Sequence, residues 1–306
     1  MALSTSEASP SGTYLAVCGI YRDEARYLRE WVEFHRLVGV ERFYLYDNGS
    51  EDDHREVLGP YVHQGVVHVT SWPGRPAQLA AYEDCLKRHR DEARWIAFLD
   101  VDEFLFSPTG HAVSTLLRDY ERWPGVGVNW AVFGTSGHQV PPGGLVIESY
   151  LRRTSEPDFN RHIKTIANPA RVRAFCKPSF FMYDEGLAVD ENHRCITGPP
   201  WSVTASVSFE RLRINHYTTR SATEYAAKVS RGWPDSSTPP SRFADERSMR
   251  RRLAAMDQLH DDAILRYAPA LRRALARPPR ASRDRPPSAP ERIGAPIGTP
   301  PGREGI

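Results

Sequence analysis

The sequence predicts an α/β fold in which a mostly parallel central sheet is flanked by helices. Strand-like and helix-like segments alternate four times in the first 106 residues, a pattern typical of parallel strands joined by right-handed crossovers. Two of the strand-like segments, 13–20 and 95–100, are unbroken apolar runs, as expected for strands that are buried on both faces of a sheet. The G-x-G-x-x-G fingerprint is absent after the first of them, so a dinucleotide dehydrogenase is not expected.

The elements of this first half follow one another as strand and helix. Asp23 and Glu24 stand in the first turn of the first helix, where acids suit the helix dipole, and Gly39 is its expected stop. The turn-forming run Asp47-Asn-Gly-Ser50 ends the second strand. The expected strands are 13–20, 41–46, 66–71 and 95–100, and the expected helices are 23–38, 52–61 and 78–90.

The second half has a mixed pattern of short strands between long loops. Its expected elements are a helix at 114–123, strands at 126–133, 145–152, 163–166, 172–175, 202–209 and 211–217, and a final helical region at 245–275. The motif Ser221-Ala-Thr-Glu224 is a capping box and predicts the start of another helix after the last strand. Long irregular segments inside a compact domain are usually functional.

Composition indicates a soluble globular protein. The chain has 306 residues, 40% of them hydrophobic, and a formal net charge of +2, which gives no reason to expect nucleic-acid binding. No apolar run approaches the roughly 20 residues that cross a bilayer, and residues 1–11 do not resemble a signal peptide, so a cytoplasmic protein is expected. The four cysteines lack C-x-x-C spacing and are expected to be buried thiols.

The chemistry of the chain is suggested by two carboxylates, Asp100 and Asp102, at the end of the strand 95–100. On a strand, alternate side chains share a face, so both acids are expected on one side at its carboxyl end. Carboxylate oxygens suit magnesium, manganese or calcium; the alternative is a pair of ordinary turn or cap acids. Asp47 follows the second strand and would line the same rim, where it could accept from a ribose hydroxyl or a pyrimidine N–H unless it is a turn aspartate.

Four segments of the first half resemble the glycosyltransferase family 92 group and related family 2 glycosyltransferase-like proteins. They are 23–35, 43–50, 78–85 and 95–106, and the later segments 130–138, 162–166 and 213–221 are similar to further blocks of that family. The resemblance covers about residues 15 to 235. One departure is Arg22-Asp-Glu24, where the family reads Lys-Asn-Glu, so the contact made by Asp23 stays open.

The resemblance implies a GT-A fold. One domain would then cover 13–275, with a nucleotide-sugar half at 13–106, an acceptor half at 107–240 and C-terminal helices at 241–275. It also implies a nucleotide-sugar donor, expected to be a UDP-sugar, and a transfer to a hydroxyl acceptor that is inverting and depends on Mn²⁺ or Mg²⁺. The flanking residues 1–12 and the Pro- and Arg-rich residues 276–306 are predicted to be flexible and disordered.

Under this resemblance Asp100 and Asp102 form the D-x-D motif. Asp102 would hold the metal, and Asp100 would contact the ribose, or the metal through water. His216 is the further expected metal ligand because it ends a strand in a matching block, although a lone histidine is often structural. Further residues expected at the nucleotide sugar are Asp23, Asp47, Gln78, Asp84 and Lys228.

Other roles follow from what a transfer needs. An inverting reaction needs a base that removes the acceptor's proton. Asp190 and Glu191 are the candidates because they lie about ninety residues beyond the D-x-D motif. Asp184 and Glu185 are the alternatives, and any of these acids could instead be a solvated loop residue. Arg220, Lys228 and Arg231 could reach the leaving phosphate or form a solvated helix face. Trp130, Phe133 and His138 are candidates for the acceptor, since aromatic faces suit sugar rings; core packing explains Phe133 just as well.

Two rival functions fit parts of the sequence. A buried strand ending in D-x-D also marks haloacid-dehalogenase-type phosphatases, and Asp261-Asp262 could be the later acidic pair of such an enzyme. In those proteins, however, the D-x-D motif lies on the first strand of the fold, whereas three strands precede it in this sequence. The second rival is a GT-A-like protein that binds a nucleotide sugar or glycan without transfer. The basic tail from Arg272 to Arg303 is either a solubilising segment or a weak contact for acidic lipid headgroups.

Overall fold

The computed structural model describes residues 12–74, 77–197, 202–231 and 246–277. The predictions for residues 1–11 and 278–306 lie outside the described residues, as do those for 198–201 and 232–245. Among the helices of the described ranges, none has the length and apolarity that a bilayer crossing needs.

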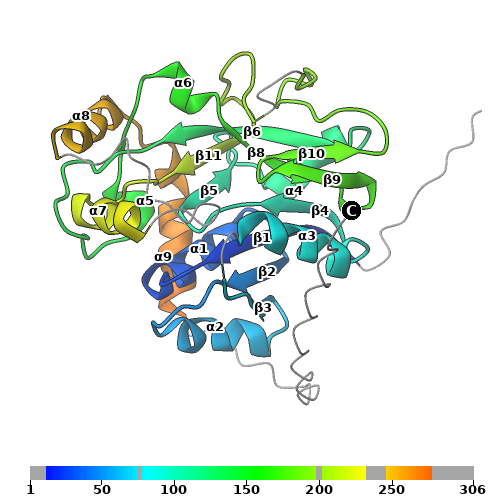
Figure 1. Ribbon diagram of the computed structural model, residues 1–306, viewed down its shortest axis with the longest axis horizontal. Helices are drawn as coiled ribbons and strands as arrows, with labels where there is room; N and C mark the ends of the chain where they lie inside the picture. Colours follow the sequence, from blue (N-terminus) through cyan, green and yellow to red (C-terminus); the bar gives the residue numbers. More distant parts are fainter. Residues whose placement is uncertain (1–11, 75–76, 198–201, 232–245, 278–306) are drawn as a thin grey trace, which may run out of the picture.

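The main sheet has eight strands in the order β3, β2, β1, β4, β8, β6, β11, β5. The first four pair in parallel, and the second four are mixed, since only β6 and β11 pair in parallel there. The predicted α/β fold, with a parallel half and a mixed half, is confirmed (Figure 1). The strands are β1 (Thr13–Tyr21), β2 (Arg42–Asp47), β3 (Val67–Ser71), β4 (Ala93–Phe98), β5 (Glu103–Phe106), β6 (Gly125–Val132), β8 (Ile163–Ala167) and β11 (Arg213–His216).

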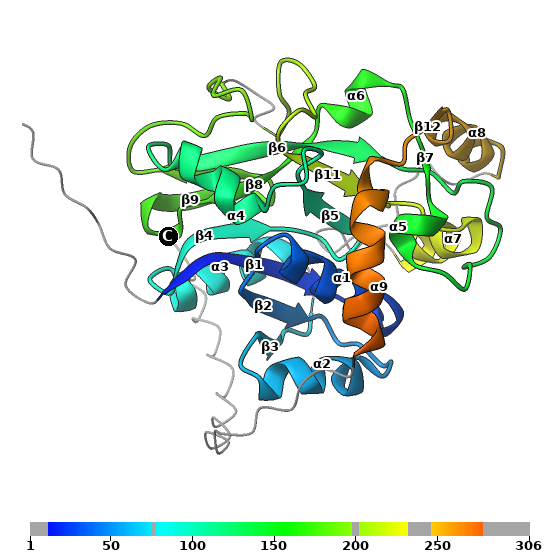
Figure 2. The same cartoon turned by 180° about the vertical axis from the view of Figure 1, so that it is seen from behind.

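Helices cover both faces of this sheet. On one face lie α1 (Ala25–Leu37), α2 (His54–His63) and α9 (Ala268–Ala276), and α9 is turned towards the reader in Figure 2. On the other face lie α3 (Gln78–His89) and the hairpin of β9 (Val172–Lys177) and β10 (Phe180–Tyr183) (Figure 1).

The unbroken apolar runs are explained by this double cover. In β4, Trp95 belongs to the hydrophobic cluster beneath α1 and α9, whereas Phe98 belongs to the cluster beneath α3. Because successive side chains of a strand point to opposite faces, a strand between two helical layers needs apolar residues at every position. Both side chains are fully buried.

The remaining helices and short strands surround the sheet. Both views place α7 and α8 at the same end, and the short strands β7 and β12 pair beside them (Figures 1 and 2). These elements are α4 (Val113–Leu116), η1 (Leu117–Tyr120), α5 (Val146–Ser149), β7 (Arg152–Arg153), α6 (Pro157–Asn160), η2 (Pro169–Arg171), α7 (Ala222–Arg231), α8 (Glu246–Met256), β12 (Leu259–His260) and η4 (Ala263–Tyr267).

Two helix-end predictions agree with the structure, and one boundary shifts. Gly39 follows α1 with a φ of +102°, and a Cβ there would lie 2.3 Å from Ser114 Oγ, so glycine is required. The capping box is formed: Ser221 N–H donates to Glu224 Oε2 over 3.1 Å. Helix α1 begins at Ala25, so Asp23 and Glu24 precede its first turn.

Three predicted elements of the second half are wrong. The expected strand 145–152 contains the helix α5, because the buried carboxylate of Glu30 accepts from the N–H groups of Val146 and Ile147 at its start. The described part of the expected strand 202–209 forms only an isolated bridge at Val203, and side chains such as Asn129 accept from its backbone. The expected helical region 245–275 is interrupted by β12, which pairs with β7.

The cysteine prediction is correct for two of the four residues. Cys18 and Cys85 are buried free thiols between the sheet and α3, whereas Cys176 and Cys195 are exposed. The expectation of four buried thiols is therefore wrong, since the last two cysteines lie in the mixed half outside its core.

Candidate active site

A cavity of about 540 Å³ opens where the strands of the sheet end. Tyr21 ends β1, Asn48 follows β2, Asp100 follows β4, Val132 ends β6 and His216 ends β11, and all five line it. Ligands of open α/β sheets bind beyond the carboxyl ends of the strands, where side chains from several strands converge. Helices α7 and α8 close the cavity with Lys228, Arg231, Arg252 and Met256.

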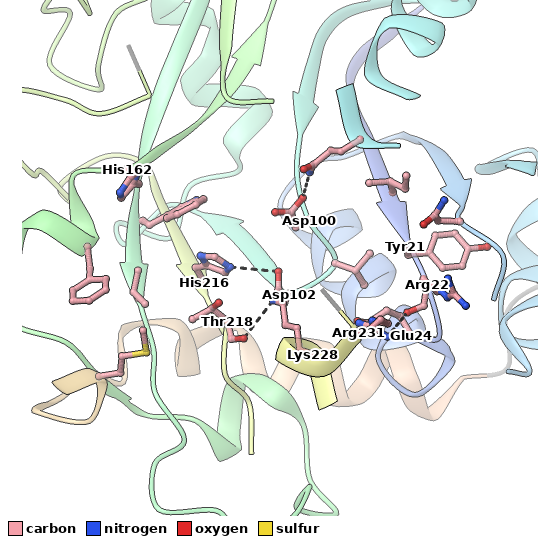
Figure 3. A pocket seen from close by; sticks show the side chains of 18 of the residues that line it. Tyr21, Arg22, Glu24, Asp100, Asp102, His162, His216, Thr218, Lys228 and Arg231 are labelled. Atoms are coloured by element: carbon pink, nitrogen blue, oxygen red, sulfur yellow. Dashed lines mark hydrogen bonds and ion pairs between the residues drawn. The ribbon is translucent and has the colours of Figure 1, made fainter. Parts of the chain in front are cut away.

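Asp100 and Asp102 lie beyond the end of β4, not on it. The strand ends at Phe98, and the two acids occupy the turn that leads into β5, where Glu103 N–H donates to Asp100 O over 3.0 Å. The expectation that strand alternation orients both acids alike is therefore wrong. The two side chains have different partners (Figure 3).

Asp102 is held between two groups from the second half of the chain. Its Oδ1 lies 3.5 Å from His216 Nε2, and its Oδ2 accepts from Lys228 Nζ over 2.5 Å. Burial alone would raise the pKa of Asp102, but Lys228 and His216 lower this pKa well below its usual value. Asp102 is therefore an ionised carboxylate at neutral pH, and Figure 3 shows His216 and Lys228 reaching it from different elements.

His216 completes a donor pair that suits a divalent cation. Its ring packs 4.4 Å from the Trp130 ring, and its Nδ1 is buried without a hydrogen-bond partner in the described part of the chain. One carboxylate and one imidazole fit manganese or magnesium when a substrate supplies the other ligands. Within the described ranges, no group of three or more His, Cys, Asp or Glu side chains forms a complete metal cage. A cation bound by protein and substrate together fits these residues.

Asp100 points into a separate set of contacts. Gln78 Nε2 donates to Asp100 Oδ1 over 2.6 Å, and Lys164 Nζ lies 2.9 Å from Asp100 Oδ2. The Asp100 side chain is 32% exposed, so a ligand can still reach it. Gln78 and Asp100 thus lie together at the cavity wall, whereas the sequence did not mark Lys164 as a partner.

Three further acids expected at the nucleotide lie outside the main cavity. Asp47 Oδ1 accepts from Ser50 N–H over 2.8 Å, and its Oδ2 lies 3.5 Å from His54 Nε2, which is the geometry of a turn aspartate. Asp84 on α3 accepts from Tyr46 and pairs with Arg88. Asp23 has a φ of +55° and lines a smaller adjoining pocket of about 180 Å³.

The acids proposed as the base do not reach the cavity. Asp190 Oδ1 accepts from the N–H groups of Asn192 and Arg194, each over 2.9 Å. Glu191 is buried, and its carboxylate accepts from backbone N–H groups of residues 210–212. The alternatives, Asp184 and Glu185, are exposed and do not line the cavity either. This geometry does not support the base hypothesis for any of the four.

The acceptor candidates separate in the same way. Trp130 lines the cavity beside His216, with His162 at a ring distance of 5.4 Å on its other side. His138 lies elsewhere, because its Nε2 is 3.0 Å from Ser149 O and its ring packs on Tyr150. His162 begins the matching block 162–166 but was not predicted as a site residue, and nothing in the sequence marked Phe159 or Met256 as cavity residues.

The cations near α7 are partly committed to other groups. Arg220 Nη1 donates to Glu24 Oε2 over 2.6 Å, and its guanidinium stacks 3.7 Å over the Tyr27 ring. Arg231 lines the cavity and donates to Arg22 O over 3.2 Å. Lys228 and Arg231 can therefore meet an anion in this cavity, as can Arg22 and Arg252, which also line it, whereas Arg220 supports the wall.

The family model of glycosyltransferase family 92 matches residues 12–266. This chain belongs to glycosyltransferase family 92. A family 92 protein of Oryza sativa subsp. japonica is 36% identical over 160 residues, which is 51% of this chain and 27% of that protein. A galactan beta-1,4-galactosyltransferase of Arabidopsis thaliana is 32% identical over 106 residues, 31% of this chain and 20% of that enzyme.

The similarity of this family 92 member to solved structures is weak. The S. aureus protein TarS, residues 1–349 in complex with UDP, is 12% identical over 52% of this chain and 47% of that chain, with a TM-score of 0.35. A score this low adds nothing to the family assignment. This chain spans less than a third of the length of the curated relatives that it matches.

The phosphatase rival has no support from the second acidic pair. Asp261 lies 2.7 Å from Arg153 Nε and 3.0 Å from Arg213 Nη2, so its carboxylate is engaged on the far side of β11 from the D-x-D turn. With the family assigned, we set this rival aside.

Proposed function

We propose that this family 92 member transfers a sugar from a nucleotide sugar, specifically a UDP-sugar, to a hydroxyl acceptor with the help of Mn²⁺ or Mg²⁺. The observation that carries the proposal is the convergence of His216 and Lys228 on the ionised Asp102 beside Asp100, at the carboxyl ends of the strands. Acidic, imidazole and ammonium groups in one cavity match a ligand that is both anionic and metal-binding.

In this proposal the two acids of the D-x-D motif bind different parts of the donor complex. Asp102 and His216 would hold the cation, which neutralises the diphosphate charge when it is bound. Asp100, oriented by Gln78, accepts a hydrogen bond from a ribose hydroxyl. Lys228 and Arg231 provide further positive charge for the diphosphate as the bond to the sugar breaks.

The other wall of the cavity would bind the acceptor. Trp130, Phe159 and Met256 present apolar surface there, and aromatic faces suit the C–H face of a sugar ring. These three residues come from β6, α6 and α8, so an acceptor hydroxyl would approach the donor sugar from the side of these elements.

We keep an inverting outcome as part of the proposal. Since Asp190 and Glu191 are engaged elsewhere, the base would be another group of the cavity. His162 is favoured because burial lowers its pKa, which keeps the imidazole neutral and able to accept a proton at neutral pH. The anomeric configuration of the product, measured by NMR, tests this; a product that retains the donor's configuration contradicts it.

The main test measures turnover of a panel of UDP- and GDP-sugars, in the presence of Mn²⁺ and in the presence of EDTA. Turnover is detected as release of the nucleoside diphosphate. Asp102→Asn is expected to reduce turnover by at least about 100-fold, the size of effect seen when one electrostatic group of an active site is lost. Asp262→Asn makes the same chemical change at a side chain that is 68% exposed and should leave turnover unchanged.

The outcomes separate the alternatives. Equal turnover in wild type and Asp102→Asn would rule out the proposed role of this carboxylate. Binding of a nucleotide sugar without release of the diphosphate would support a non-catalytic protein. Hydrolysis of simple phosphate esters without nucleotide-sugar binding would support the alternative function of a phosphatase.

A further inference from the structure

A buried ammonium group stands behind the first acid of the D-x-D motif. Lys164 lies on β8, and its side chain is only 3% exposed. Its Nζ is 2.9 Å from Asp100 Oδ2 and 3.8 Å from Glu103 Oε2. Lysine is rarely buried to this extent unless it is paired, so these contacts account for its presence in the core.

The sheet explains how a lysine from the second half reaches this point. β8 pairs antiparallel with β4, with Ala97 opposite Ile166. Continued towards its N-terminus, β8 passes beside the turn that follows β4, and Lys164 lies on that part of β8. The position of the ammonium is therefore set by the sheet register and not by a flexible loop.

Glu103 couples this ammonium to the backbone of the turn. It is fully buried, and its Oε2 accepts from Asp100 N–H over 2.9 Å while facing Lys164. Burial alone would lower the pKa of Lys164, but Asp100 and Glu103 raise it well above its usual value, so the ammonium stays charged. One cation thus faces both the Asp100 carboxylate and the residue that binds the Asp100 amide.

These contacts leave Asp100 little freedom. Gln78 binds one carboxylate oxygen, Lys164 binds the other, and Glu103 binds the backbone amide. Tyr82 O–H also lies 3.5 Å from Asp100 Oδ1, whereas Oδ2 keeps a second acceptor direction for a ligand, because each carboxylate oxygen has about two lone-pair sites. A group fixed before the ligand arrives loses less entropy on binding than a mobile one.

We propose that Lys164 is a positioning residue for donor binding, which holds the Asp100 carboxylate in the orientation that accepts the ribose of the nucleotide. This inference rests on the proposed function above. It also separates the two acids: Asp100 is committed to Lys164 and the nucleotide, while Asp102 with His216 serves the cation.

The test is a double-mutant cycle read by UDP affinity, measured calorimetrically in EDTA. Lys164→Met is expected to weaken UDP binding by about tenfold or more, as a small misplacement of a binding group does. In the Asp100→Asn background the same substitution should change the UDP affinity by less than about twofold, because the group it positions is already altered. Mn²⁺ affinity without nucleotide should stay within about twofold of wild type in all variants, since Asp102 and His216 are unchanged.

Two further variants guard against a trivial result. Lys177→Met makes the same change at an exposed lysine of β9 and should leave UDP affinity unchanged. Lys164→Met combined with Glu103→Gln removes the ammonium together with the buried carboxyl group that faces it. This double variant is expected to fold where Lys164→Met alone does not, and to show the same loss of UDP affinity.

The outcomes are decisive in each direction. An equal loss of UDP affinity with and without Asp100→Asn, or a parallel loss of Mn²⁺ affinity, would mean that Lys164 only supports the fold, and would overturn the inference. Unchanged UDP affinity in Lys164→Met would also overturn it. If wild type binds no UDP either in EDTA or with Mn²⁺, the proposed function fails first, and the inference fails with it.

Discussion

At the scale of single residues, partners decide what a carboxylate does. Asp102 meets His216 and Lys228 in a cavity, where a ligand can replace or join them. Glu191 is also buried, and its carboxylate accepts from backbone N–H groups and from Ser208, all of which are internal contacts. The sequence made both acids candidates for the site, and only the packed chain separates a site residue from a loop anchor.

Glu191→Ala therefore tests a structural role against a catalytic one. The substitution leaves the N–H groups of residues 210–212 without their acceptor and is expected to lower the free energy of unfolding by about 2 to 4 kcal/mol. Urea unfolding measures this change. The turnover number per folded molecule should stay within about twofold of wild type, because Glu191 does not line the cavity. A loss of turnover without a loss of stability would restore Glu191 as the base.

His35 makes stability depend on pH. The ring is fully buried; its Nδ1 lies 2.8 Å from Trp31 O, and its Nε2 accepts from Leu105 N–H over 3.1 Å, a pattern that needs the neutral form. Burial lowers the pKa of His35 to about 4, against 6.5 in the unfolded chain. Between these values the unfolded state binds the extra proton, so this contribution is complete above pH 6.5 and is lost as the pH falls towards 4.

The measurement compares urea unfolding at pH 7 and pH 5. Wild type is expected to lose about 2 kcal/mol more than His35→Gln over this interval, since the glutamine does not titrate. His260→Gln changes a side chain that is 59% exposed and should keep the pH slope of wild type. Identical slopes in wild type and His35→Gln would contradict the assignment.

At the scale of elements, α7 connects a local sequence signal to the site. Its capping box, Ser221 with Glu224, fixes the start of the helix, and two turns later Lys228 reaches Asp102. Ser221→Ala removes the cap and is expected to lower the opening free energy of α7 by about 1 kcal/mol. Hydrogen exchange of the α7 amides measures this, and the donor KM should rise with it, because Lys228 is less often in place.

Ser230→Ala is the matched control for the cap. It makes the same chemical change at an exposed position in the last turn of α7 and should alter neither hydrogen exchange nor the donor KM. A raised KM in Ser221→Ala with unchanged exchange of α7 would show that the cap does not act through the helix.

At the scale of the whole molecule, local patterns predicted the parallel half and long-range contacts decided the rest. β1 to β4 and α1 to α3 each carry their own signal, an apolar run or a helical spacing. The start of α5 depends instead on Glu30, which is 116 residues away in the chain. No window of sequence contains such information.

In the candidate site, too, some residues were predictable from the sequence and others depend on long-range contacts. The strand-end pattern and the family resemblance together predicted that Asp100, Asp102, His216 and Lys228 meet, and the structure brings them together, although their roles stay predictions. Lys164 escaped notice because one lysine in a short strand is the ordinary pattern of a half-exposed strand. The pairing of Lys164 with Asp100 can be inferred only from the register of β8 against β4, which the sequence does not give.

The C-terminal segment is tied into the domain by a buried ion cluster. Asp261 lies between Arg153 of β7 and Arg213 of β11, and the Arg213 side chain is only 4% exposed. Further along, Leu271 of α9 belongs to the same hydrophobic cluster as Trp31 of α1. The segment therefore closes the core of the domain, and weakening its contacts should lower the stability of the whole sheet.

Asp261→Asn tests this closure. It leaves the buried Arg213 without its counter-charge and is expected to lower the free energy of unfolding by about 3 kcal/mol, whereas Asp262→Asn, at a side chain that is 68% exposed, should change it by less than about 0.5 kcal/mol. Unfolding followed by tryptophan fluorescence and by far-ultraviolet circular dichroism should give one coincident transition in both variants, because the cluster belongs to a single cooperative unit. Two separated transitions in Asp261→Asn, with the sheet unfolding at the wild-type midpoint, would mean that the C-terminal segment docks as an independent piece.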